Sequence, residues 1–316
     1  MTGPAVREVA MAAERQTAGS GRGAAGGRFG TRVSGTTAVP AGRMVDLPGR
    51  GRTYLVDIPG PEGAPTVILL HGLVTTAMLN WFPALAELSE HYRVVLFDQR
   101  WHGHGIRSPR FDLDDLADDV VAVAEVTGVD RPILAGYSMG GIVAQSVARR
   151  RPDLVGGLVL CATTYRFREK WRERLFHGGM ALLAGVMTET AGRRVAEAAT
   201  KLPHMPEISW ETGRMDRWAL AELRTTSGWA MTQAIAELGR FDSSPWLSSL
   251  RVPTGVVITT HDRALPVYRQ LEMATMIAGA EIFLVSAGHA ACVLEADAFV
   301  PVLLEACAAV AARRES

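Results

Sequence analysis

The sequence has little that would cross-link its parts or carry it into a membrane. It has three cysteines, Cys161, Cys292 and Cys307, which lie in apolar stretches without the spacing of metal ligands. We therefore expect buried thiols in a reducing compartment rather than disulfides. No run approaches the ~18 apolar residues of a membrane span, and no apolar segment of a secretory signal follows Arg7. These absences predict a cytoplasmic protein without a transmembrane segment.

An excess of one charge is also absent. Lys+Arg and Asp+Glu each total 33, so the chain lacks the basic field that binding to nucleic acid or an anionic membrane would need. The sequence has neither a glycine-rich dinucleotide fingerprint nor a cluster of metal ligands, and we expect no cofactor and no metal. Hydrophobic residues make up 48% of the 316 residues, which is ample for a sizeable core.

Apolar runs and helical patterns alternate along most of the chain. Short apolar runs such as 66–70 and 94–97 are typical of strands buried on both faces of a sheet. Because helical patterns separate them, the sequence predicts an α/β fold with a doubly wound, mostly parallel sheet. Residues 1–42 are rich in Gly, Ala and Arg and predict a disordered tail.

The alternation stops between residues 165 and 245. That region shows helical patterns and no strong strand, which predicts a helical cap inserted after the sixth strand. The core would then comprise residues 43–164 and 246–316. The helices expected in the cap cover 171–182, 191–201 and 215–239.

A serine lies between two glycines in the stretch Gly136-Tyr137-Ser138-Met139-Gly140. An apolar run precedes it and a helical pattern follows it, which predicts a strand, a sharp turn and a helix. Ser138 would lie exposed at the positive end of the helix, with the Met139 N–H directed at any negative charge nearby. The alternative is a structural turn with an idle serine.

A serine nucleophile needs a base, and the base needs a carboxylate that orients it. In an open α/β sheet we look for both beyond the carboxyl ends of the strands. His289 follows the last strand and is the expected base. Asp262 follows the strand that ends near Thr260 and is the expected carboxylate, whereas Asp98 is a competitor for which a structural role is favoured.

The order Ser138, Asp262, His289, together with His71-Gly72 after an early strand, resembles the α/β-hydrolase superfamily, of the serine esterase or lipase-like type. The stretch from Asp98 to Ser108 resembles a loop of that family, with Trp101 in place of a usual glycine. The resemblance implies that Ser138 is the nucleophile and that His289 is base and then acid, partnered by Asp262. It also implies an oxyanion hole from the N–H groups of Leu73 and Met139, and a structural His71.

The cap sequence is rich in Trp, Met and Leu, which favours a small-molecule ester with a hydrophobic acyl group. Trp101, Tyr137 and Trp218 are the candidate substrate contacts. Alternatives with the same triad are a thioesterase, a C–C bond hydrolase and a cofactor-free haloperoxidase-like enzyme. A non-catalytic ligand-binding protein of this fold is a further alternative.

Overall fold

The computed structural model describes residues 41–186, 218–219, 222–223, 225–226 and 228–314. Nearly all of the expected tail and the whole expected helix 191–201 lie outside these residues. Within the expected tail, Gly42 is described, and its N–H donates to the hydroxyl of Tyr54 at 2.9 Å. The division into core and cap stays a prediction.

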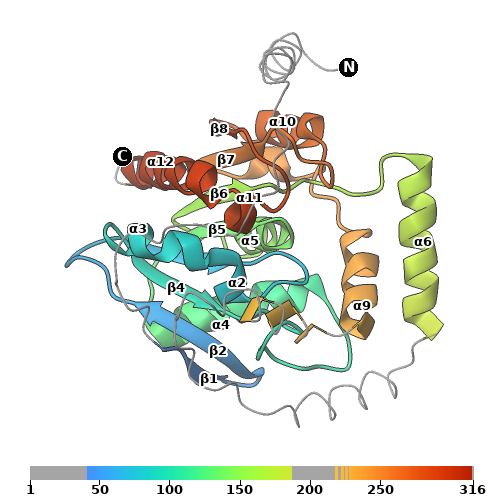
Figure 1. The fold of residues 1–316 in the computed structure, drawn as a ribbon, viewed down its shortest axis with the longest axis horizontal. Helices are drawn as coiled ribbons and strands as arrows, with labels where there is room; N and C mark the ends of the chain where they lie inside the picture. Colours follow the sequence, from blue (N-terminus) through green and yellow to red (C-terminus); the bar gives the residue numbers. More distant parts are fainter. Residues whose placement is uncertain (1–40, 187–217, 220–221, 224, 227, 315–316) are drawn as a thin grey trace.

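The core is an eight-stranded sheet with the strand order β1-β2-β4-β3-β5-β6-β7-β8, which runs from β1 at the bottom of Figure 1 to β8 at the top. The strands from β4 to β8 pair in parallel, and β2 pairs antiparallel with β1 and β4. The predicted mostly parallel α/β fold is confirmed. The strands are β1 Arg43–Leu47, β2 Gly51–Ile58, β3 Thr66–Leu70, β4 Arg93–Phe97, β5 Ile133–Tyr137, β6 Gly157–Cys161, β7 Thr254–Thr259 and β8 Glu281–Val285.

Two hydrophobic layers enclose the sheet, because successive side chains of a strand point to opposite faces. In β3, Val67 and Leu69 pack into one layer, and Ile68 and Leu70 pack into the other. The first layer is completed by α2 (Ala77–Trp81), α3 (Leu85–Ser89), α11 (Ala291–Leu294) and α12 (Ala296–Arg314); the 3-10 turn η1 (Phe82–Ala84) joins α2 to α3. The second contains α4 (Leu113–Thr127), α5 (Met139–Arg150) and α10 (Val267–Met276).

Helix α4 begins after Asp112, whose side chain accepts a hydrogen bond from the N–H of Asp114. Two further acidic residues, Asp114 and Asp115, lie in its first turn, and Asp119 lies near its middle. Asp119 is buried and its carboxylate contacts both Arg50, in the turn after β1, and Arg100, each at 2.5 Å. This buried ion pair fixes the β1–β2 hairpin and the loop after β4 to α4.

The cap region contains two described helices that lie side by side at the right of Figure 1, α6 (Trp171–Val186) and α9 (Gly228–Leu238). The single helix expected at 215–239 is wrong, since a turn and a bend at Thr225 and Thr226 precede α9. The Thr225 hydroxyl donates to the carbonyl of Glu222 at 2.6 Å, and the Thr226 hydroxyl donates to the carbonyl of Val74 at 3.2 Å. Threonine hydroxyls that bond in this way compete with helical structure.

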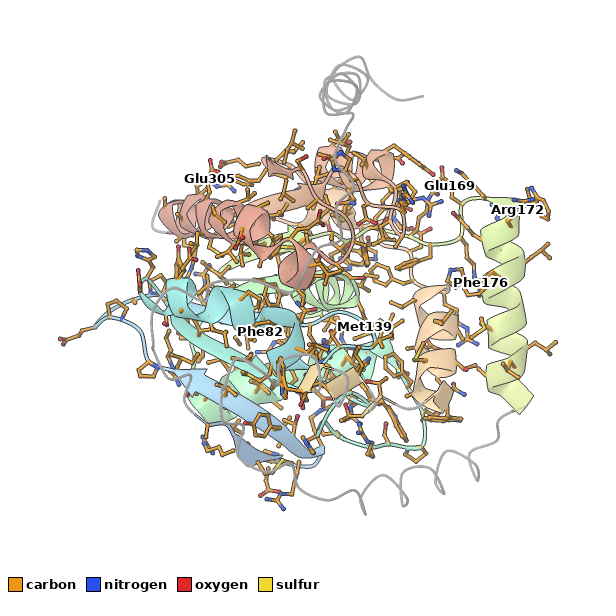
Figure 2. The ribbon with its side chains drawn as sticks, viewed as in Figure 1. Phe82, Met139, Glu169, Arg172, Phe176 and Glu305 are labelled. Carbon is orange, nitrogen blue, oxygen red and sulfur yellow. The ribbon has the colours of Figure 1, made fainter. Side chains whose placement is uncertain are left out.

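Charged side chains connect α6 to the core. Glu169 lies where the chain passes from the core to α6 (Figure 2), and its carboxylate accepts hydrogen bonds from Arg269 at 2.9 Å and the hydroxyl of Tyr268 at 2.9 Å. Glu173, in the first turn of α6, accepts from Arg269 at 2.7 Å. The Arg269 side chain is only 3% exposed, so α10 supplies a buried cation between the carboxylates of Glu169 and Glu173 at the start of α6.

The three cysteines are free and buried, as their apolar surroundings predict. Burial raises the pKa of the Cys292 and Cys307 thiols to about 12, so both stay protonated near neutral pH. Among the described residues, no helix is long and apolar enough to cross a membrane.

Candidate active site

Ser138 lies at the junction between β5 and α5, in a backbone conformation that serine rarely adopts. Its φ is 52° and its ψ is −112°, and a non-glycine residue there costs about 1–3 kcal/mol. The surrounding structure holds it: the Ser138 N–H donates to the carbonyl of Cys161 at 2.9 Å, and its carbonyl accepts from the Thr163 hydroxyl at 2.7 Å. The hydroxyl of Ser138 is thereby presented at the carboxyl edge of the sheet.

The glycines on either side of Ser138 allow this turn. A Cβ atom on Gly136 would lie 2.3 Å from the carbonyl oxygen of Gly140, and one on Gly140 would lie 2.1 Å from the carbonyl oxygen of Leu70. Both neighbours are backbone atoms that cannot move without displacing β3 or α5. The sequence pattern therefore reflects the close approach of strand and helix.

His289 and Asp262 lie in one hydrogen-bonded chain with Ser138, as expected from their positions after the ends of strands. The Nε2 atom of His289 is 3.1 Å from the Oγ of Ser138, and its Nδ1 is 2.7 Å from the Oδ2 of Asp262. Because a carboxylate only accepts, Nδ1 carries the proton and Nε2 is free to accept the serine proton. The three side chains thus form a continuous chain of hydrogen bonds.

Asp262 is held as a carboxylate by donors from its own loop. Burial opposes its ionisation, but the hydrogen bonds from His289, the Leu265 N–H and the Thr259 hydroxyl outweigh burial and lower its pKa. Its Oδ1 accepts from the N–H groups of Ala264 and Leu265, both at 2.8 Å. The side chain is therefore charged and fixed in direction.

A loop at residues 71–76 runs past Ser138. A Cβ atom built on Gly72 would lie 3.5 Å from the Cβ of Ser138. The Gly72 carbonyl accepts from His71 Nδ1 at 2.8 Å and from the Thr75 hydroxyl at 3.0 Å. Since the C=O and N–H of one trans peptide point in opposite directions, these two bonds also set the direction of the Leu73 N–H.

Neither the N–H of Leu73 nor that of Met139, the first residue of α5, donates to an acceptor in the part of the chain that the structure describes. The Gly72 N–H, by contrast, donates to the Oδ1 of Asn80 at 3.0 Å. Leu73 and Met139 follow Gly72 and Ser138 in the chain. Backbone N–H groups without an acceptor, close to a serine hydroxyl, are what a developing oxyanion requires.

His71 has both ring nitrogens engaged within the structure. Its Nε2 accepts from the N–H of Gln99 at 2.9 Å, so its Nδ1 carries the proton that bonds to Gly72. Burial, together with the neighbouring His102, lowers the pKa of His71 well below its usual value. His71 is thus neutral and connects the 71–76 loop to the loop after β4.

Within the described part of the chain, Asp98 makes no hydrogen bond to His289. Its two oxygens accept from the N–H groups of Ala77 at 2.9 Å and His104 at 2.8 Å. Burial is the main cause that raises its pKa to about 6. These contacts support the structural role expected for Asp98 in the loop after β4.

The buried His102 provides a test of stability against pH. Burial lowers its pKa to about 4 from 6.5, so the unfolded chain binds more protons below pH 6.5 and the free energy of unfolding falls as pH decreases. His102 should account for a loss of about 2 kcal/mol between pH 7 and pH 5. Asp98 has a raised pKa, so its contribution to the free energy of unfolding increases as pH decreases. The pH dependence of the whole protein therefore does not isolate His102.

The variant His102→Asn isolates this contribution, because Asn Nδ2 can replace the Nδ1 donor to the Arg100 carbonyl. Denaturant unfolding at both pH values should show a loss on acidification about 2 kcal/mol smaller than in the parent protein. An equal loss in the two proteins would contradict a buried neutral imidazole at this position.

The three candidate substrate contacts lie at different places. Tyr137 is buried, and its hydroxyl donates to the carbonyl of His289 at 2.7 Å, so it supports the histidine loop. Trp101 is 1% exposed and has a φ of 67°. Its ring packs against that of Trp229 in α9, with the two ring centroids 4.5 Å apart. Trp218 packs edge-on against Phe82, with the two ring centroids 5.4 Å apart. Contact with a substrate stays a prediction for all three.

Sequence reasoning missed several polar residues around the site. Asn80 is 1% exposed and its Oδ1 accepts from the Gly72 N–H at 3.0 Å. Gln270 is fully buried and donates to the hydroxyl of Thr259 at 3.2 Å. Asn80 is the one polar residue of the apolar helix AMLNW, a pattern that would have marked it as buried and hydrogen-bonded. Gln270 lies between Arg269 and Glu272, and no sequence pattern marks it as buried.

The described residues contain no group of three or more His, Cys, Asp or Glu side chains that could hold a metal ion.

Residues 65–296 match the family described as alpha/beta hydrolase fold. A putative carbamate hydrolase RutD from Rhizobium rhizogenes is 29% identical over 244 residues, 75% of this chain and 90% of the relative. The 3-oxoadipate enol-lactonase 1 of Acinetobacter baylyi is 24% identical over 213 residues, 67% of this chain and 77% of the relative. The crystal structure of an enol-lactonase from Burkholderia xenovorans superposes with a TM-score of 0.64 at 24% identity, covering 83% of this chain and 98% of that one.

The fold and the site define a hydrolase architecture. Because the family match covers most of the chain, this protein belongs to the alpha/beta hydrolase fold family.

Proposed function

We propose that this protein is a serine hydrolase that cleaves carboxylic esters with a hydrophobic acyl group through an acyl-enzyme on Ser138. The observation that carries the proposal is the chain of hydrogen bonds from Ser138 Oγ to His289 at 3.1 Å and from His289 to Asp262 at 2.7 Å. The strained φ of Ser138 supports it, since strain of this kind concentrates at functional sites.

In the proposed mechanism, His289 Nε2 takes the proton of Ser138 while Oγ attacks the carbonyl carbon of the ester. The carbonyl oxygen becomes an oxyanion, which the N–H groups of Leu73 and Met139 stabilise. The imidazolium then protonates the leaving alkoxide, and the alcohol departs. Water attacks the acyl-enzyme, His289 takes its proton, and the acid and the free serine hydroxyl are formed.

The apolar acyl group is proposed from the residues by which the cap meets the core. Trp229 of α9 is 6% exposed and packs against Trp101, and Trp218 is 8% exposed and packs against Phe82. The boundary between the cap and the core is thus made of large aromatic side chains, and an acyl chain that entered between them would pack against apolar rings. The cap thus supports an apolar acyl group more than a charged one.

Hydrolysis of a carbamate is the second candidate, because several relatives are named putative carbamate hydrolases and match 90% or more of their own length. The proposed triad and oxyanion donors suit either bond, since both reactions pass through a tetrahedral oxyanion. The fold does not discriminate between them.

A panel of p-nitrophenyl esters of increasing acyl length, one p-nitrophenyl carbamate, one lactone and one thioester tests the proposal. We expect kcat/KM to be highest for an ester and to rise with acyl length up to an optimum. Turnover of the carbamate alone would favour the second candidate. A folded protein that turns over no member of the panel would favour the ligand-binding alternative.

A further inference from the structure

A short segment of the cap contacts the 71–76 loop directly. The hydroxyl of Thr226 donates to the carbonyl of Val74 at 3.2 Å, and the hydroxyl of Thr76 donates to the Oε2 of Glu222 at 2.5 Å. Although about 150 residues separate the two segments in the chain, the described pieces lie beside α2 in Figure 1. We call these two hydrogen bonds the cap–loop contact.

Val74 is under strain at this contact. Its φ is 75°, a conformation that is an outlier for a β-branched residue. Such a conformation persists only where the surroundings over-determine it. Because φ of Val74 turns the peptide that joins it to Leu73, relaxation of Val74 would also turn Leu73.

The hydrogen bond between Thr76 and Glu222 holds the end of the 71–76 loop that leads into α2. Thr76 precedes α2, and its Oγ accepts from the N–H of Leu79 at 3.1 Å while its proton goes to Glu222. Thr76 is 1% exposed and Glu222 is 8% exposed. The cap therefore fixes the residue at which the loop enters α2, and Thr226 fixes the residue next to Leu73.

We propose that Thr226 and Glu222 are positioning residues, which hold the 71–76 loop so that the Leu73 N–H faces the oxyanion. The inference rests on the proposed function, in which Leu73 supplies that donor. Neither residue needs to contact the substrate. The cap would then determine the rate of the chemical step as well as what binds.

The variant Thr226→Val tests this, because it keeps the shape of the side chain and removes the hydroxyl. We expect kcat on the best ester to fall about ten- to hundredfold with little change in KM, as for a misplaced catalytic group. Thr225→Val is the matched control, since its hydroxyl bonds within the cap segment, to the Glu222 carbonyl. It should keep the kcat of the parent protein. Equal losses in both variants would overturn the proposal.

A second set of variants separates positioning from general damage to the fold. Glycine at position 74 can adopt a positive φ without strain. Thr226→Val should therefore lower kcat less in the Val74→Gly background than in the parent protein. Glu222→Gln keeps an acceptor for Thr76 and should retain activity, whereas Glu222→Leu should lose it. A full loss in the Val74→Gly background, or equal behaviour of the two Glu222 variants, would argue against the proposal.

Hydrogen exchange gives a readout that does not depend on turnover. Peptides covering residues 71–76 should exchange faster in Thr226→Val than in the parent protein, and at the parent rate in Thr225→Val. Unchanged exchange in Thr226→Val would refute the positioning role even if the parent protein is active. A parent protein without activity on the panel, but with the expected exchange, would instead refute the proposed function.

Discussion

Replacing Ser138 with alanine is expected to lower kcat on the best ester by about six orders of magnitude. The acyl-enzyme cannot form without Oγ, and what remains is the effect of binding and of the oxyanion donors. The fold should survive, because alanine keeps Cβ and the Ser138 hydroxyl bonds to the side chain of His289, at 3.1 Å, rather than to a backbone group that holds the turn. Release of p-nitrophenol by the purified variant, measured over long incubations, gives this loss of kcat directly.

A fluorophosphonate probe gives an independent readout of the same residue. It should label the parent protein at Ser138 and leave Ser138→Ala unlabelled. Thermal unfolding should place the two midpoints close together, which excludes loss of structure as the cause. Substantial turnover by the alanine variant would mean that another group is the nucleophile.

The variant Asp262→Asn should lower kcat by about four orders of magnitude. Oδ1 of Asp262 faces the N–H groups of Ala264 and Leu265, so the carbonyl of asparagine must lie there and its NH2 must face His289. The imidazole would then need to accept at Nδ1 and carry its proton on Nε2. In that tautomer it cannot take the proton of Ser138.

Asp98→Asn is the matched control, since it makes the same chemical change at the competing carboxylate. Both oxygens of Asp98 accept from backbone N–H groups, so one donor would face the new NH2 at a cost of about 1–3 kcal/mol. We expect a lower unfolding midpoint and a kcat close to that of the parent protein. If Asp98→Asn lost activity and Asp262→Asn kept it, the two roles would have to be exchanged.

The placement of the three proposed catalytic residues could be predicted because each follows the end of a strand. Ser138, Asp262 and His289 come after β5, β7 and β8, and parallel strands bring their carboxyl ends to one edge of the sheet. The strands themselves could be predicted because each buried strand is a short apolar run of consecutive residues. Their catalytic roles stay predictions until the variants are measured.

Contacts between distant segments could not be predicted. Arg50 and Asp119 are 69 positions apart, and Val74 and Thr226 are 152 apart. A guanidinium or a hydroxyl accepts many partners, and no periodic pattern marks which one it meets. The expected helix at 215–239 was wrong for a related reason, since the hydroxyls of Thr225 and Thr226 are used in bonds that a helical pattern does not reveal.

The buried guanidinium of Arg269 bears on any attempt to transplant a cap from a relative onto this core. A donor cap without carboxylates at the positions of Glu169 and Glu173 would leave that cation uncompensated, at a cost of about 3–5 kcal/mol. A chimaera should therefore exchange residue 269 together with the cap, for example as Arg269→Leu. If Arg269 were kept, a chimaera that failed to express would report the unpaired cation and not the substrate specificity of the new cap.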